Sequence, residues 1–60
     1  MSKTQIRAIL RNAFGPRGYR ITREGEIHIY GQMPNTDQVG WYFFGHLDSA
    51  ETLARIAELE

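Results

Sequence analysis

Four consecutive aromatic residues, Trp41 to Phe44, lie between two glycines and constrain the fold of this chain more than any other segment. Side chains alternate between the two faces of a β-strand, so Trp41 and Phe43 share one face while Tyr42 and Phe44 share the other. A chain of 60 residues buries only about 60% of the surface that its unfolded form exposes, so it has one small core. One aromatic pair therefore cannot lie in the same core as the other, and alternation alone leaves open which pair is buried.

The composition excludes several ways of stabilising or anchoring a small chain. No cysteine is present, and two isolated histidines do not supply the four ligands of a structural zinc site. We therefore expect no metal and no cofactor. The longest apolar stretch is the aromatic run itself, far below the ~20 residues of a membrane helix, and the first residues lack the apolar region of a signal peptide. These features predict a cytoplasmic protein that does not interact with membranes.

The first segment predicts a helix from about Lys3 to Phe14. Ser2 can cap the helix while Gln5 reaches back to it, an arrangement known as a capping box. Gly15-Pro16 supplies a stop. Residues at helical spacing form one apolar stripe: Ile6, Ile9, Leu10, Ala13 and Phe14.

Tyr19 to Tyr30 reads as a β-hairpin. A two-residue loop would mix apolar and polar residues on each face, whereas the three-residue loop Arg23-Glu24-Gly25 pairs Ile21 with Ile27 and leaves Gly25 at the position that requires positive φ. That register places one set of side chains on the core face: Tyr19, Ile21, Ile27 and Ile29. It places another set on the opposite face: Arg20, Thr22, Glu26, His28 and Tyr30.

The last segment begins with Asp48-Ser49-Ala50-Glu51, which has the pattern of a helix cap with an acid three residues later. Its apolar stripe is narrow and rich in small residues: Ala50, Leu53, Ala54 and Ala57, with Ile56 at the edge. The whole chain thus predicts a single α+β domain over residues 1–60. Its order is helix, three-stranded antiparallel meander, helix (αβββα), with both helices on one face of the sheet and the other face open.

A net charge of zero hides a strong asymmetry along the chain. Residues 1–23 carry six basic side chains and no acid, whereas residues 24–60 carry all seven acids and only Arg55, so the two parts are +6 and −6. Such separation is typical of an anion-binding patch, but two oppositely charged elements can also neutralise each other. In that second arrangement, Arg7 and Arg11 on the first helix would face Glu51 or Glu58 on the last.

Catalysis has little support in the sequence. His28 has no nucleophile, phosphate-binding loop or acid partner at a recognisable spacing, so it is better interpreted as a strand residue packed beside Arg20 and Tyr30. His46 and Asp48 offer only two ligands, which do not make a metal site. We expect a protein that is not an enzyme.

Nucleic-acid binding is one of two functional hypotheses. The basic side chains recur every four residues on the first helix and continue into the hairpin, as phosphate contacts require: Lys3, Arg7, Arg11, Arg17 and Arg20. If Trp41 or Tyr42 shares the open face with Arg20, His28 and Tyr30, it can also stack on an unpaired base. The zero net charge and the absence of a known nucleic-acid-binding motif count against this hypothesis.

Protein binding is the other hypothesis and the one that the sequence favours. An aromatic patch rimmed by arginine and polar residues has the composition of an interface, and a second copy of the chain could also cover it. The nine residues Gly31–Val39 form a long polar connection, and loops of this kind often carry function. The candidate protein-binding residues are Arg20, His28, Tyr30, Met33, Asn35, Trp41 and Tyr42.

The segments Gly31-Gln32-Met33-Pro34-Asn35 and Gly40-Trp41-Tyr42-Phe43-Phe44-Gly45, with the compact pattern of the whole chain, resemble small accessory early-region proteins of temperate lambdoid bacteriophages. The resemblance implies a non-enzymatic regulator that modulates host replication, transcription or the lysis decision by binding a bacterial protein. It carries no functional residue over to this chain.

Overall fold

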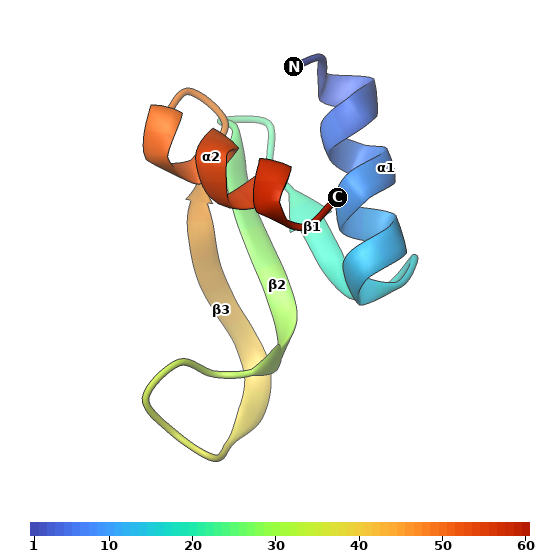
Figure 1. The fold of residues 1–60 in the computed structure, drawn as a ribbon. Coiled ribbons are helices and arrows are strands. Elements are labelled where there is room, and N and C mark those ends of the chain that lie inside the picture. The colour runs from blue at the N-terminus through green and yellow to red at the C-terminus, as the bar shows by residue number, and fades with distance from the viewer.

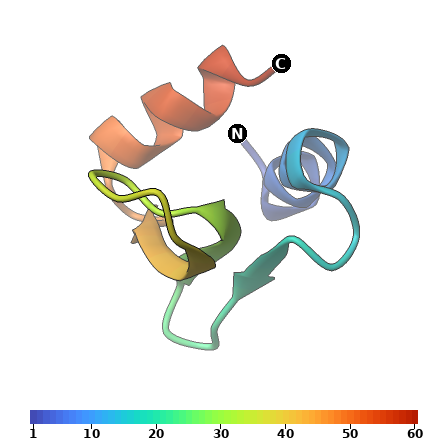
Figure 2. The same ribbon diagram turned by 90° about the horizontal axis from the view of Figure 1, so that it is seen from below.

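The computed structural model describes all 60 residues as a helix, three strands and a helix. The elements are α1 (Lys3–Phe14), β1 (Tyr19–Ile21), β2 (Glu26–Gln32), β3 (Val39–His46) and α2 (Ala50–Glu58). The strands form one antiparallel sheet in the order β1-β2-β3, and both helices lie on the same side of it (Figures 1 and 2). The predicted αβββα meander is confirmed. Neither helix has the length and apolar character needed to cross a lipid bilayer.

Helix α1 has the predicted capping box. The Gln5 backbone N–H donates to Ser2 Oγ at 3.1 Å, and the Ser2 N–H donates to Gln5 Oε1 at 2.9 Å, so two amides that lack partners within the helix are satisfied. At the other end, the Gly15 N–H donates to the Arg11 carbonyl, and Pro16 follows. The helix therefore begins and ends where the sequence predicts.

The hairpin between β1 and β2 has the predicted register, with Tyr19 opposite Ile29 and Ile21 opposite Ile27. A hydrogen bond of 2.9 Å from the Thr22 N–H to the Glu26 carbonyl closes the loop Arg23-Glu24-Gly25. Gly25 has φ +92°, a backbone conformation that side chains of L-residues disfavour. The register follows from this turn together with the separation of apolar and polar faces.

Helix α2 differs from the prediction in its cap and in its buried face. The cap is Ser49, whose Oγ accepts from the Thr52 N–H, and not Asp48. Thr52 and Ile56 are the buried residues of α2, whereas the predicted stripe residues are exposed at three positions: Ala50, Ala54 and Ala57. The buried face differs from the prediction because α2 approaches β3 closely through Thr52.

That close approach occurs at Gly45. A β-bulge between β2 and β3 places Ile27 opposite Gly45 but His28 opposite Phe43, so Phe44 is an extra residue on β3. A Cβ atom at Gly45 would lie 2.9 Å from Thr52 Cβ, inside the space of the Thr52 side chain. Glycine at this position therefore lets α2 pack onto the strand through Thr52.

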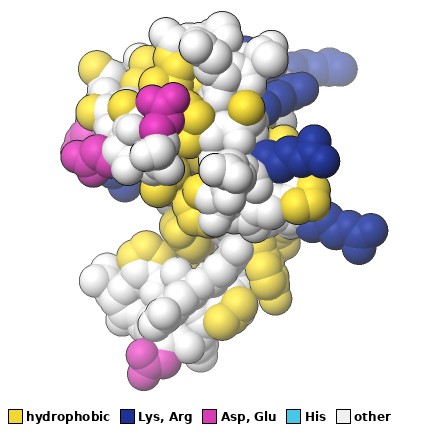
Figure 3. Space-filling model, turned by 45° about the vertical axis from the view of Figure 1, so that its right-hand side comes forward, with side chains coloured by type: hydrophobic (Ala, Val, Ile, Leu, Met, Phe, Trp, Pro, Cys, Tyr) yellow, Lys and Arg dark blue, Asp and Glu magenta, His cyan; other side chains and the backbone are white.

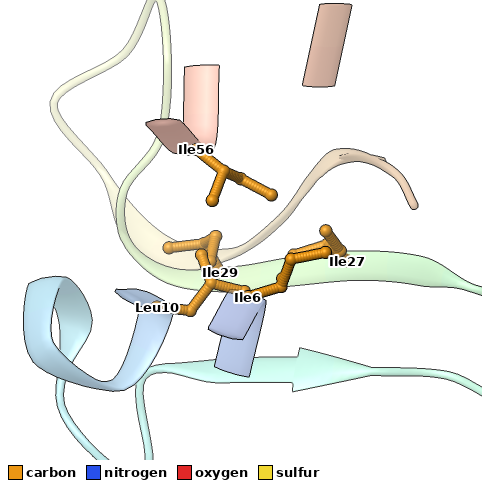
Figure 4. Close-up of a cluster of buried hydrophobic side chains, with 5 residues drawn as sticks. All are labelled: Ile6, Leu10, Ile27, Ile29 and Ile56. Atoms are coloured by element: carbon orange, nitrogen blue, oxygen red, sulfur yellow. The ribbon is translucent and has the colours of Figure 1, made fainter. Parts of the chain in front are cut away.

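Five buried aliphatic side chains from three elements form the core: Ile6, Leu10, Ile27, Ile29 and Ile56. Figure 4 shows the side chains of α1, β2 and α2 pointing toward one another. Tyr42 and Phe44 are partly buried and pack against this cluster. Trp41 and Phe43 lie on the opposite face of β3 and are exposed, which resolves the alternative that alternation left open.

Candidate functional site

The open face of the sheet gathers basic and aromatic side chains from all three strands. Arg20 lies opposite His28, His28 opposite Phe43, and Tyr30 opposite Trp41, so alternation places all five on the face away from the helices. The exposed fractions of Tyr30, Trp41 and Phe43 are 49%, 42% and 58%. We call these five residues the open-face cluster.

Within the open-face cluster, Arg20 reaches across the sheet. It belongs to β1, yet its Cζ atom lies 5.2 Å from the centre of the Trp41 ring on β3, within the range of a cation–π contact. Tyr30 on the strand between them packs edge-on against the same indole, with ring centres 5.5 Å apart. The indole ring of Trp41 thus holds the Arg20 guanidinium over the open face.

His28 occupies the other part of the open-face cluster. Its ring packs edge-on against Phe43, with centres 5.7 Å apart, and its Nε2 lies 3.5 Å from Glu26 Oε1. No group of three or more His, Asp or Glu side chains is arranged to hold a metal ion anywhere in the chain. The surroundings of His28 are those of a packed strand residue.

The basic side chains of the first 23 residues have no carboxylate partner. The ion pairs in the structure both involve histidine, His28 with Glu26 and His46 with Asp48. Helices α1 and α2 are in contact, but the expected pairing of Arg7 or Arg11 with Glu51 or Glu58 does not form. In Figure 3 most of the visible lysine and arginine side chains gather along one edge of the molecule, and several acidic side chains lie on the opposite side next to another basic side chain.

We call the exposed residues Lys3, Arg7, Arg11 and Arg17 the basic edge. It borders an open groove between α1 and β1. The groove has a volume of about 580 Å³, and Arg7, Arg11, Asn12 and Tyr19 are among the residues that line it. All five predicted nucleic-acid-binding residues are exposed: Lys3, Arg7, Arg11, Arg17 and Arg20. Arg20 follows Tyr19 on β1, which lines the groove, but its own side chain lies on the open face over Trp41.

The loop that joins β2 to β3 lies at the end of the hairpin that extends beyond the helices (Figure 1). Its own hydrogen bonds order it, including one of 2.9 Å from the Met33 N–H to the Gln38 carbonyl. Asn35 has φ +68°, and Met33 Sδ lies 3.7 Å from the position that a Cβ at Gly40 would take. Met33 therefore folds back toward β3, while Asn35 is exposed at the tip of the loop.

The candidate residues are brought together in part. Arg20, His28, Tyr30 and Trp41 meet on the open face, whereas Tyr42 lies on the helix-covered face because it alternates with Trp41. Phe43 was not among the candidates. Its spacing of two from Trp41 is the signal that could have identified it.

Comparison of the chain with protein-family models, with curated proteins and with solved structures finds no match. The residues of the open face and the basic edge are therefore the basis for inferring a function.

Proposed function

We propose that the protein binds nucleic acid through its open face, with the basic edge contacting phosphates. The observation that carries the proposal is Arg20: its guanidinium lies over the Trp41 ring on the open face, and no carboxylate pairs with it. A guanidinium presents a planar fork of donors that suits phosphate oxygens and the edge of guanine. The contact with Trp41 restricts the motion of the Arg20 side chain and so lowers the conformational entropy that is lost on binding.

The aromatic members of the open-face cluster add a second kind of contact. Phe43 is 58% exposed, and its ring can stack on an unpaired base, an interaction worth about 1 to 3 kcal/mol per base. The zero net charge counts less against nucleic-acid binding in the structure than in the sequence, because several acidic side chains lie on the side opposite the basic edge (Figure 3). A phosphate chain approaching the basic edge meets a local positive field.

A regulator or adaptor that binds a protein partner through the same face is the second candidate function. The observation that favours it is the exposure of large apolar side chains on β3, where Val39 and Phe43 are 62% and 58% exposed. Such a patch is typical of protein interfaces. A phage early protein acting on a host protein, as the sequence resemblance implies, would belong to this class.

Fluorescence anisotropy with labelled single-stranded and double-stranded oligonucleotides separates the two functions. We expect binding that weakens steeply as salt rises, because phosphate contacts release counterions. Arg20→Gln should weaken binding by about tenfold or more, in line with the loss of ~1.5 to 3 kcal/mol for a hydrogen bond to a charged group. Arg55→Gln is the matched control, since it removes the same charge from helix α2, and it should leave the affinity within about twofold.

Two results would reject nucleic-acid binding through the open face. One is the absence of any salt-dependent binding to either kind of oligonucleotide at low ionic strength. The other is equal weakening by Arg20→Gln and Arg55→Gln, which would reveal attraction by total charge without a defined surface. Retention of a bacterial protein on the immobilised domain after nuclease treatment, lost in Arg20→Gln, would instead support the protein-binding function.

A further inference from the structure

The hydrogen-bond pattern of the sheet identifies which backbone groups of β3 are free. The Tyr30 N–H donates to the Gly18 carbonyl, and the Thr22 N–H donates to the Glu26 carbonyl. The even-numbered residues of β2 therefore direct their N–H and C=O groups toward β1. In an antiparallel sheet these directions alternate, so the odd-numbered residues of β2 face β3.

The partners of those odd-numbered residues on β3 include Gly40 and Tyr42, which direct their backbone groups back toward β2. The intervening residues direct theirs outward, to the free edge of the sheet: Val39, Trp41 and Phe43. These are the three β3 residues with large exposed apolar side chains. Free hydrogen-bonding groups and exposed apolar surface thus coincide on one strand edge.

This edge lacks the features that normally prevent strand pairing. Proteins protect edge strands with charged side chains, proline or short length. From Val39 to Gly45 the strand has neither charge nor proline, and β3 spans eight residues. The other edge strand, β1, has three residues and carries Arg20. The exposed part of β3 also lies on the section of the hairpin that extends beyond the helices (Figure 1).

We propose that a second copy of this chain pairs with this edge, β3 antiparallel to β3, about a two-fold axis at Trp41. The axis places Trp41 opposite the same residue of the second copy and Val39 opposite Phe43. Each of these opposed positions can exchange two hydrogen bonds. Their side chains share one face of the sheet, so the aromatic and β-branched residues also contact across the junction.

A second copy fits this edge for two reasons. The outward-facing run is self-complementary under a two-fold axis, with an aromatic residue at its centre and apolar residues on both sides. The free part of the strand edge also ends at a defined residue. At the bulge, Arg55 Nη2 donates to the Phe44 carbonyl, so the next backbone acceptor along β3 is already occupied. Pairing through the edge extends the sheet and leaves its open face free, so this inference goes beyond the proposed function and does not depend on it.

Sedimentation equilibrium of the purified chain, after nuclease treatment and in high salt, tests the proposal without a contribution from nucleic acid. We expect a concentration-dependent dimer. Val39→Pro removes an outward N–H without breaking a hydrogen bond within the chain, so it should retain the native circular dichroism and weaken the dimer by about tenfold or more. Val39→Ile is the matched control, because it keeps the N–H and the β-branched side chain, and it should leave the dimer intact.

A chain that remains monomeric at millimolar concentration would overturn the proposal, as would a dimer that survives Val39→Pro unchanged. If Val39→Pro does not fold, Phe43→Lys supplies the same test, because it places a charged side chain on the paired edge, which opposes strand pairing. A folded Phe43→Lys variant should be monomeric, and one that still dimerises with the affinity of the parent chain would reject the β3 edge.

Discussion

The two faces of β3 each hold an arginine above an aromatic ring, but the two arginines differ in what else they contact. On the helix-covered face, Arg55 Cζ lies 4.6 Å from the centre of the Phe44 ring, and its guanidinium also donates to the Phe44 carbonyl. On the open face, Arg20 lies over Trp41 without a hydrogen-bond acceptor from the protein. The first arginine ties α2 to the sheet, whereas the second keeps its donors for a ligand.

The largest difference in stability between substitutions on the two faces is expected for the neighbouring β2 residues Ile29 and Tyr30. Ile29→Ala removes a fully buried side chain from the centre of the core and should lower the free energy of unfolding by about 2 to 5 kcal/mol. Tyr30→Ala removes an exposed ring from the open face and should cost less than about 1.5 kcal/mol. Urea denaturation of both variants measures the difference, and equal losses would contradict the division between a core face and a binding face.

The close approach of α2 to β3 predicts a second large effect. Gly45→Ala inserts a methyl group into the space of Thr52, and such overpacking costs about 1 to 3 kcal/mol. Thermal unfolding should show a lower Tm, and the double variant Gly45→Ala with Thr52→Ala should recover part of the loss. A single variant as stable as the parent chain would show that α2 does not depend on this contact.

Strain in the hairpin turn predicts an intermediate effect. Gly25 has φ +92°, and an added Cβ would also lie 2.9 Å from His46 Cε1, so Gly25→Ala should destabilise the domain by about 1 to 2 kcal/mol. The open-face cluster does not include this turn, so nucleic-acid affinity under folding conditions should be unchanged. An unaltered melting curve would show that the turn does not require glycine at position 25.

The two arginines themselves predict a smaller effect on stability. Arg55→Gln should lower the free energy of unfolding by about 1 kcal/mol, because it loses a cation–π contact and a hydrogen bond to the backbone. Arg20→Gln loses only the exposed contact with Trp41 and should cost about 0.5 kcal/mol. Chemical denaturation measures both values. The opposite order would mean that Arg20 is the structural residue of the two.

The smallest stability effect is expected at the basic edge. Arg7 forms no ion pair with α2, so Arg7→Glu should change the free energy of unfolding by no more than about 0.5 kcal/mol, while binding to oligonucleotides should weaken and lose part of its salt dependence. Thermal melts and anisotropy titrations check the two parts. A marked loss of stability would instead indicate that the basic side chains of α1 serve to neutralise the acidic side chains of α2.

Local rules predicted most of the fold correctly. The capping box of α1, the glycine in the turn and the alternation along β3 each depend on a few neighbouring residues, so the sequence determines them directly. The buried face of α2 was predicted only in part. Leu53 and Ile56 pack in or against the core, but the predicted stripe missed Thr52, which is buried because Gly45 on β3 has no side chain in its way. Ala54 and Ala57 have apolar side chains, yet the position of the helix leaves them exposed.

The candidate site was predicted less completely for the same reason. Alternation placed Trp41 and Phe43 together, but only the packing of the helices determined that this pair, and not Tyr42 with Phe44, would lie on the open face. The contact between Arg20 and Trp41 crosses an intervening strand, so no spacing in the sequence indicates it. The absence of ion pairs along the basic edge likewise depends on how α1 and α2 are placed relative to each other.

The emission of Trp41, the only tryptophan in the chain, tests most directly the claim that the open face binds nucleic acid. At fixed protein concentration, addition of an unlabelled oligonucleotide should change this emission with the same midpoint as the anisotropy titration, and high salt should reverse the change. The Arg20→Gln variant should shift both midpoints together. Binding that leaves Trp41 emission unchanged would place the contact away from the open face and contradict the account.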